Sequence, residues 1–215
     1  EITSKAAIDN SNVYMIYTYA DYRRTYFSKY DYSGNLIWNK SLESTNNWFT
    51  PYMASAQIAA DNTGNIYIAA CYMGEFDLDP TASIQYHRGN GHPFVAKYNS
   101  SGDLVWFKDI VETAVGIGTY IEPTALAVDK VGNLLIAVSP FVKTPGLQID
   151  ADPNAGTAFM ATAFVTKWSS TGNYIWAQDY LGNRINALAI DASNNVYMTG
   201  SFGQYLTINS IGVHL

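Results

Sequence analysis

Several features that would point to a particular chemistry are scarce in this sequence. It has one cysteine, Cys71, so no disulfide can form within the 215 residues. The apolar residues 68–70 before it read as a buried strand, and we interpret Cys71 as a small core residue rather than a reactive thiol. No apolar run approaches the ~20 residues that a membrane-spanning helix needs, and no signal peptide is recognisable.

Positive charge is also scarce. The formal net charge is −6, and the nearest approach to a basic run is the pair Arg23 and Arg24. An acidic surface repels phosphate backbones, so we expect no nucleic-acid partner. The acidic balance is compatible with an exported protein or with a protein that binds cations.

Signatures of catalysis are missing as well. The sequence contains no Gly-x-Ser-x-Gly elbow and no His-Glu-x-x-His pair, and no serine or cysteine nucleophile has a recognisable base. We therefore expect no enzyme. Carboxylates from different parts of the chain can pair in space, which is an arrangement that the sequence alone does not reveal.

Aromatic residues and glycine are plentiful. The chain has 17 Tyr, 9 Phe, 5 Trp and 16 Gly, and 48% of it is hydrophobic, which argues against disorder. Long charged helical stretches are lacking. This composition favours an all-β protein with many turns.

The strongest signal is an internal repeat. One block reads Asp-x-x-Gly-Asn-apolar-Tyr; it starts at Asp61 and recurs from Asp129 and Asp191, with a copy one residue shorter from Asp9. Apolar runs flank each block, and Gly and Asn tolerate the positive φ of a tight hairpin. Each copy therefore predicts a hairpin.

A second block alternates with the first. It reads aromatic-x-x-Lys-aromatic, three residues, Gly-x-apolar-apolar-Trp, and its lysines are Lys29, Lys97 and Lys167. A lysine that recurs in every copy points to a structural role, with its stem packed against a neighbouring ring. The stretches between hairpins vary in length while the hairpins do not, as expected for loops on a constant scaffold.

Two hairpins per repeat make four strands, which is the composition of a β-propeller blade. We predict one all-β propeller domain over residues 1–215, with four-stranded antiparallel blades at about 5–42, 56–110, 124–180 and a partial fourth at 184–215. Three and a half blades do not close a ring, so we expect either a piece of a longer chain or completion by further blades from another chain. The tight turns lie on one face of the disc and the long connections on the other, which is the expected working face.

The chain resembles the bacterial β-propeller repeat called SBBP through residues 58–69, 74–80, 94–106 and 196–203. The resemblance spans nearly the whole chain, and it implies a propeller from a large exported or cell-surface bacterial protein. The sequence departs from the repeat in two places: the first copy lacks the Asp-x-Asp-Pro segment, and Leu135 replaces the usual tyrosine in the third.

Two Asp-x-Asp-Pro segments occupy equivalent positions. Asp77 with Asp79, and Asp150 with Asp152, would each place two carboxylates on one side of a strand. Calcium takes six to eight oxygen ligands, so each pair is a start for a calcium site. The alternative is that these residues only shape a turn. We expect no cofactor other than calcium.

Other candidates lie in expected loops. Residues 87–92 place His87, Arg88 and His92 on one loop, where zinc would need a further ligand. Aromatic residues of the long connections could stack on a sugar or grip a protein, or fold back over the blade edge. They are Trp48, Phe49, Tyr52 and Tyr120.

The leading functional hypothesis is a non-catalytic extracellular or cell-surface module for adhesion, scaffolding or assembly. It would bind a protein or a glycan on the loop face, or use its open blade edges. The alternatives are a propeller that binds or cleaves carbohydrate and a calcium-stabilised surface protein that assembles into filaments.

Overall fold

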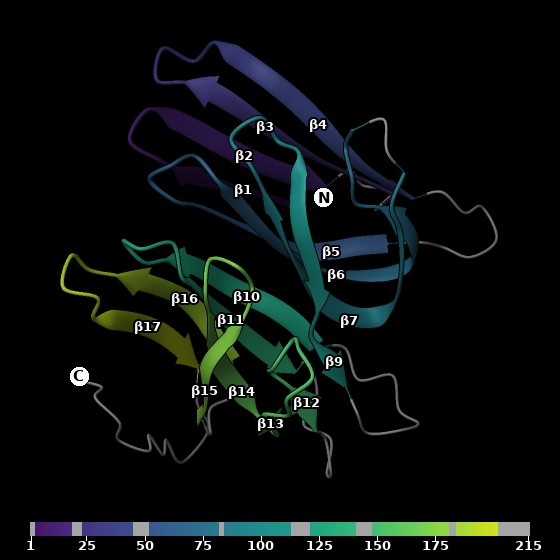
Figure 1. Cartoon of the computed structure of the whole chain (residues 1–215), viewed down its shortest axis with the longest axis vertical. Coiled ribbons are helices and arrows are strands. Elements are labelled where there is room, and N and C mark those ends of the chain that lie inside the picture. The colour runs from purple at the N-terminus through teal and green to yellow at the C-terminus, as the bar shows by residue number, and fades with distance from the viewer. Residues whose placement is uncertain are drawn as a thin grey trace. The chain divides into compact units, whose positions relative to one another are not determined.

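The computed structural model describes residues 3–18, 23–44, 52–81, 84–112, 121–140, 148–180 and 184–201. These residues form antiparallel β-strands and no helix (Figure 1). The chain divides into two compact units, residues 1–109 and 110–215. No helix of the described residues has the length and apolar character needed to cross a bilayer.

The first unit contains two four-stranded repeats. In the first repeat the strands pair in the order β1-β2-β3-β4, and in the second β6 pairs with β5 on one side and β7 on the other, with β8 beyond β7. Two residue pairs at the end of β4, Glu43 with Asp77 and Ser44 with Phe76, join the repeats. The strands are β1 (Thr3–Ile8), β2 (Asn12–Thr18), β3 (Arg24–Asp31), β4 (Leu36–Ser44), β5 (Tyr52–Ala60), β6 (Ile66–Asp77), β7 (Tyr86–Tyr98) and β8 (Leu104–Asp109).

The second unit repeats the plan. One sheet has the order β10-β11-β14-β15, and a two-stranded sheet of β16 and β17 begins a fourth repeat. Three short strands form a small sheet of their own in the order β13-β12-β9. The strands are β9 (Val111–Glu112), β10 (Ile121–Val128), β11 (Leu134–Pro140), β12 (Ile149–Asp150), β13 (Phe159–Met160), β14 (Ala163–Trp168), β15 (Tyr174–Tyr180), β16 (Arg184–Ile190) and β17 (Val196–Ser201).

The hairpin turns follow one local design. Between β5 and β6, the Asp61 carboxylate accepts hydrogen bonds from the backbone N–H groups of Thr63 and Asn65. Gly64 lies at φ +82°, where a side chain would be strained. Between β16 and β17, Asn194 takes the equivalent position at φ 65°. Every predicted hairpin is therefore present, and each is determined by residues that are neighbours in the chain.

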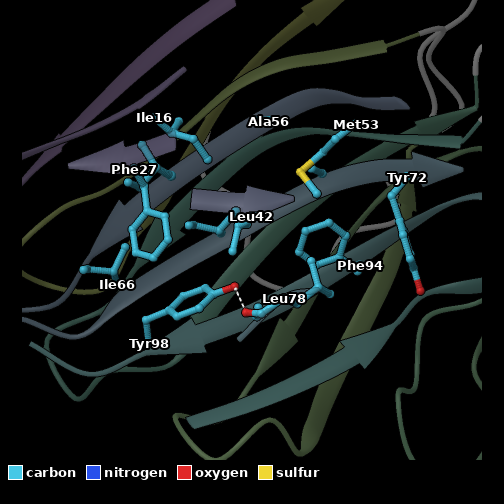
Figure 2. Packing of buried hydrophobic residues seen from close by; sticks show 14 of the residues in the cluster. Ile16, Phe27, Leu42, Met53, Ala56, Ile66, Tyr72, Leu78, Phe94 and Tyr98 are labelled. Atoms are coloured by element: carbon cyan, nitrogen blue, oxygen red, sulfur yellow. Dashed lines mark hydrogen bonds between the residues drawn. The ribbon is translucent and has the colours of Figure 1, made fainter. Parts of the chain in front are cut away.

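The core of the first unit consists of side chains from both of its repeats. Phe27, Leu42, Phe94 and Tyr98 are fully buried within it, and Figure 2 shows Phe27 and Tyr98 facing one another. Their ring centroids lie 4.8 Å apart. Cys71 is buried, as the sequence predicts.

These sheets confirm the predicted fold class: all-β, with four-stranded antiparallel blades of the propeller type. Apart from the small sheet of β9, β12 and β13, the described residues form three sets of four strands and one set of two. The sequence pattern finds the strands because hairpin turns and apolar runs are short-range signals.

Candidate functional site

One row of residues recurs across the blades and explains the repeated lysines. In the second blade the row runs Ala59, Tyr67, Lys97 and Trp106 on four adjacent strands. The Lys97 ammonium lies 5.3 Å from the centre of the Tyr67 ring. In the first blade Lys29 lies 5.6 Å from the Tyr14 ring. The predicted packing of lysine against a neighbouring ring is thus confirmed in two blades.

The tyrosine of this row donates a hydrogen bond to the aspartate of the adjacent hairpin turn. Tyr14 donates a hydrogen bond of 2.7 Å to Asp9, and Tyr197 donates one of 3.0 Å to Asp191. Burial tends to raise the pKa of Asp9, but hydrogen bonds, led by that from Tyr14, outweigh it and lower the pKa. Burial and the same carboxylate raise the pKa of Tyr14 far above its ordinary value. This polar group stabilises the blade and recurs too regularly to mark one binding site.

The two Asp-x-Asp-Pro segments form turns of the same kind. Asp77 accepts hydrogen bonds from the backbone N–H groups of Asp79 and Gln85. Asp150 does the same for Asp152 and Ala158. Among the described residues no group of three or more His, Cys, Asp or Glu side chains is placed to hold a metal ion. Calcium binding by Asp77, Asp79, Asp150 and Asp152 therefore stays a prediction.

An aromatic side chain of the third strand anchors each of these turns. The Tyr98 hydroxyl donates to the Leu78 carbonyl at 2.9 Å, and the Trp168 indole donates to the Ala151 carbonyl at 3.0 Å. These aromatics directly follow Lys97 and Lys167. The sequence shows the aromatic residue that follows each of these lysines, and it shows the Asp-x-Asp segment. It does not reveal that a hydrogen bond joins the two.

The predicted loop at residues 87–92 is a strand, and that expectation is wrong. His87, Arg88 and His92 all lie in β7. Residues 86–89 pair with residues 74–77 of β6, beyond the ends of the paired parts of β5 and β8. We call residues 74–77 and 86–89 the β6–β7 arm. Glycine and asparagine gave this segment the composition of a loop, whereas its long-range pairing makes it a strand.

The two faces of the arm differ. On the inner face, the His87 ring lies 3.9 Å from that of Phe107, centre to centre. Gly89 is buried against Tyr72; a Cβ on it would lie 2.7 Å from ring carbons of that tyrosine. On the outer face, Tyr86 and Arg88 are exposed. They pair with Asp77 and Glu75 respectively, so this face carries both signs of charge and one large aromatic ring.

A polar cluster supports the base of the arm. Asp109, at the end of β8, accepts a hydrogen bond of 3.1 Å from the Tyr72 hydroxyl, and its carboxylate lies 3.3 Å from Nε2 of His92. Burial lowers the pKa of His87, against the opposing charges of Asp109 and Asp77. The His87 Nε2 atom is buried and has no hydrogen-bond partner among the described residues. A charged His87 is thus disfavoured.

The structure places His87 and Arg88 on opposite faces of the arm and His92 at its base. Tyr72, Asp109 and Phe107 are members of the site that the sequence did not reveal. Residues 87–92 attract notice in the sequence, but nothing local connects them with the strand that ends at Asp109. Tyr52, in β5, is half-buried and pairs with Met73. Trp48, Phe49 and Tyr120 lie outside the described residues.

The chain is similar to an uncharacterized WD repeat-containing protein of Acanthamoeba polyphaga mimivirus. The two are 25% identical over 183 residues, which cover 72% of this chain and 13% of the relative. The chain thus spans a small part of that protein's length. WD repeats form four-stranded propeller blades, in agreement with the sheets described above. No family model matches the chain, and the resemblance to SBBP repeats stays a prediction.

Proposed function

We propose that this chain is a scaffold module of the β-propeller type that binds a partner protein through the outer face of the β6–β7 arm. The observation that carries the proposal is the arm itself. β6 has 12 residues and β7 has 13, whereas their neighbours β5 and β8 have nine and six. The extra length extends a strand pair beyond the paired parts of β5 and β8, and Phe76, which is buried in the core, anchors this pair to the blade.

The composition of the outer face suits protein recognition. Tyr and Arg are enriched where protein interfaces gain most of their binding energy, and Tyr86 is 54% exposed. Ile84, which precedes the arm, is 62% exposed. Glu75 and Asp77 add opposite charge beside Arg88, which favours orientation and selectivity over raw affinity.

The inner face supplies rigidity. Tyr72 makes edge contacts with Phe76, His92 and Phe94, with ring centroids between 5.2 and 6.3 Å apart. A surface held in one conformation loses less entropy on binding than a flexible loop does. The arm therefore offers a preorganised platform rather than a tether.

The similarity to a WD repeat-containing protein supports a scaffold rather than an enzyme. Export to the cell surface, calcium binding and carbohydrate binding stay as predictions from the sequence. The partner is proposed to be a protein because the arm presents an exposed tyrosine and an arginine, which are enriched at protein interfaces, beside charges of opposite sign.

The test compares two double variants for capture of interacting proteins from the source organism. Tyr86→Ala with Arg88→Glu alters the arm, while Tyr32→Ala with Lys130→Glu alters exposed positions in hairpin turns. We expect a stoichiometric partner that binds the unaltered chain and the turn variant but not the arm variant. The affinities are then measured with the purified partner. Equal binding by both variants, with both folded, would exclude the arm as the site.

A further inference from the structure

The β6–β7 arm joins its blade at two glycines with left-handed backbone. Gly74 of β6 lies at φ 94° and Gly91 of β7 at φ 92°. The pairing of the two strands also shifts register at this level, between Tyr72 and Met73. Glycines and a break in regular pairing are features of a hinge, because they let the backbone bend at one place. Both strands of the arm therefore have a hinge at its base.

Two side chains hold the arm against the blade. Phe76 and His87 lie opposite one another in the strand pair. Phe76 is fully buried in the core of the first unit, and the His87 ring lies on Phe107 of β8. Phe76 is apolar at every pH, whereas histidine changes its charge within the physiological range. His87 is therefore the part of this contact that a proton can change.

The two histidines of β7 differ in what a proton would meet. Nε2 of His92 lies 3.3 Å from the carboxylate of Asp109, so a protonated His92 has an acceptor beside it. Nε2 of His87 is buried and has no hydrogen-bond partner among the described residues. A proton there would create a buried charged N–H group without an acceptor, which is costly while the arm stays closed.

The charges around His87 do not remove this cost. Burial lowers the pKa of His87 below its ordinary value of 6.5, and the charges of Asp109 and Asp77 oppose the shift only in part. Asp77 already accepts two backbone N–H groups, and Asp109 accepts the Tyr72 hydroxyl. The titratable and charged side chains on the strands around His87 are Glu43 on β4, Tyr52 on β5, Tyr72, Glu75 and Asp77 on β6, Tyr86, Arg88 and His92 on β7, and Lys108 and Asp109 on β8.

We propose that His87 is an acid-sensitive latch, which holds the arm against Phe107 while the ring is neutral and releases it about Gly74 and Gly91 when the ring takes up a proton. The open arm lets water hydrate the charged ring, so it binds the proton first. The latch is therefore fully closed above pH 6.5 and weakens as the pH falls toward the lowered pKa of the closed arm. The consequence for binding rests on the proposed function: acid would loosen the preorganised surface and release its partner.

The test needs no partner, so its failure is distinct from failure of the proposed binding surface. Hydrogen exchange of the whole chain is compared at about pH 7.5 and about pH 5.5, with rates corrected for the intrinsic effect of pH. We expect protection of residues 74–77 and 86–89 to fall in acid by up to about tenfold, which is the ratio of charged to neutral histidine one pH unit below its ordinary pKa. Residues 66–70 and 94–98, which pair within the blade in the same two strands, should keep their protection.

Variants assign the response to one ring. His87→Phe keeps a ring beside Phe107 and takes up no proton, so its arm should be equally protected at both pH values; His87→Met is a second variant of this kind if phenylalanine does not fit. The matched control is His92→Gln, which keeps a donor for Asp109 and should retain the acid response. The proposal is overturned by unchanged or higher arm protection in acid, by an acid response that survives in both His87 variants, or by an equal loss of protection in the blade.

Discussion

Lys167 of β14 places its ammonium 2.8 Å from the carboxylate of Asp129, in the turn before β11. In this blade Leu135 stands where the first two blades have Tyr14 and Tyr67. Where leucine replaces the tyrosine, the repeated lysine therefore contacts a carboxylate instead of an aromatic ring. The substitution and the ion pair are two parts of one local arrangement.

The first prediction compares lysines. Lys167→Met leaves the Asp129 side chain, only 2% exposed, with no cation beside it, and we expect it to lower the free energy of unfolding by about 1–3 kcal/mol. Lys97→Met removes a cation–π contact and should cost about 0.5–1 kcal/mol. Urea unfolding measures both. A larger cost for Lys97→Met would show that the ion pair contributes little.

The second prediction concerns acid. Burial tends to raise the pKa of Asp129, but hydrogen bonds from Lys167 and Asn133 and the charge of Lys167 lower it below its ordinary value of 3.8. Because the folded state holds this proton less tightly, the contribution to stability is complete above 3.8 and is lost as the pH falls through the lowered pKa. Unfolding of Asp129→Asn should therefore depend less on pH below 3.8 than that of the parent chain. Parallel profiles would contradict the assignment.

The third prediction concerns His87. Burial lowers its pKa below the ordinary value of 6.5, so the unfolded chain takes up the proton first. Stability from the neutral ring is complete above pH 6.5 and is lost as the pH falls toward the folded pKa. His87→Phe keeps a ring over Phe107, and it should make the melting temperature depend less on pH between about pH 7 and pH 5. An unchanged slope would assign the pH dependence to another group.

The fourth prediction tests the anchor of the Asp-x-Asp turn. Tyr98→Phe removes the hydrogen bond to the Leu78 carbonyl and leaves that buried acceptor unpaired, at a cost of about 1–2 kcal/mol in the free energy of unfolding. Tyr30→Phe alters the same position in the first repeat, which lacks the Asp-x-Asp-Pro segment, and should cost less. Chemical denaturation decides between them, and equal costs would argue against a specific anchor.

The fifth prediction addresses the packing of the arm. Gly89→Ala would bring a methyl group against the backbone carbonyl oxygen of Tyr72 and to 2.7 Å from the Tyr72 ring, and overpacking of this kind costs about 1–3 kcal/mol. We expect faster hydrogen exchange in residues 74–77 and 86–89. The control Gly34→Ala meets no atom within 4 Å but has φ +84°, so its strain should affect only its own hairpin. Unchanged exchange in the arm would show that Tyr72 yields without disturbing it.

The candidate site was partly visible in the sequence. His87, Arg88 and His92 attract notice because ionisable side chains cluster within six residues, but the local composition predicts a loop there. Tyr72 and Asp109 lie in separate strands, and only the pairing of β6, β7 and β8 brings them to His92. Such a cluster depends on contacts between residues about 20 to 40 positions apart, which no local pattern records.

The sequence by itself determined the hairpins. Each turn is built within five residues, by an Asp, Ser or Asn side chain that accepts backbone N–H bonds and, in most copies, a glycine at positive φ. Repetition of those turns then implied four strands per blade. Only the tertiary structure decided that residues 86–89 extend as a strand, that Lys167 binds Asp129 and that Tyr197 is exposed. Each of these outcomes depends on which distant side chain lies opposite, and burial and strand pairing settle that when the chain folds.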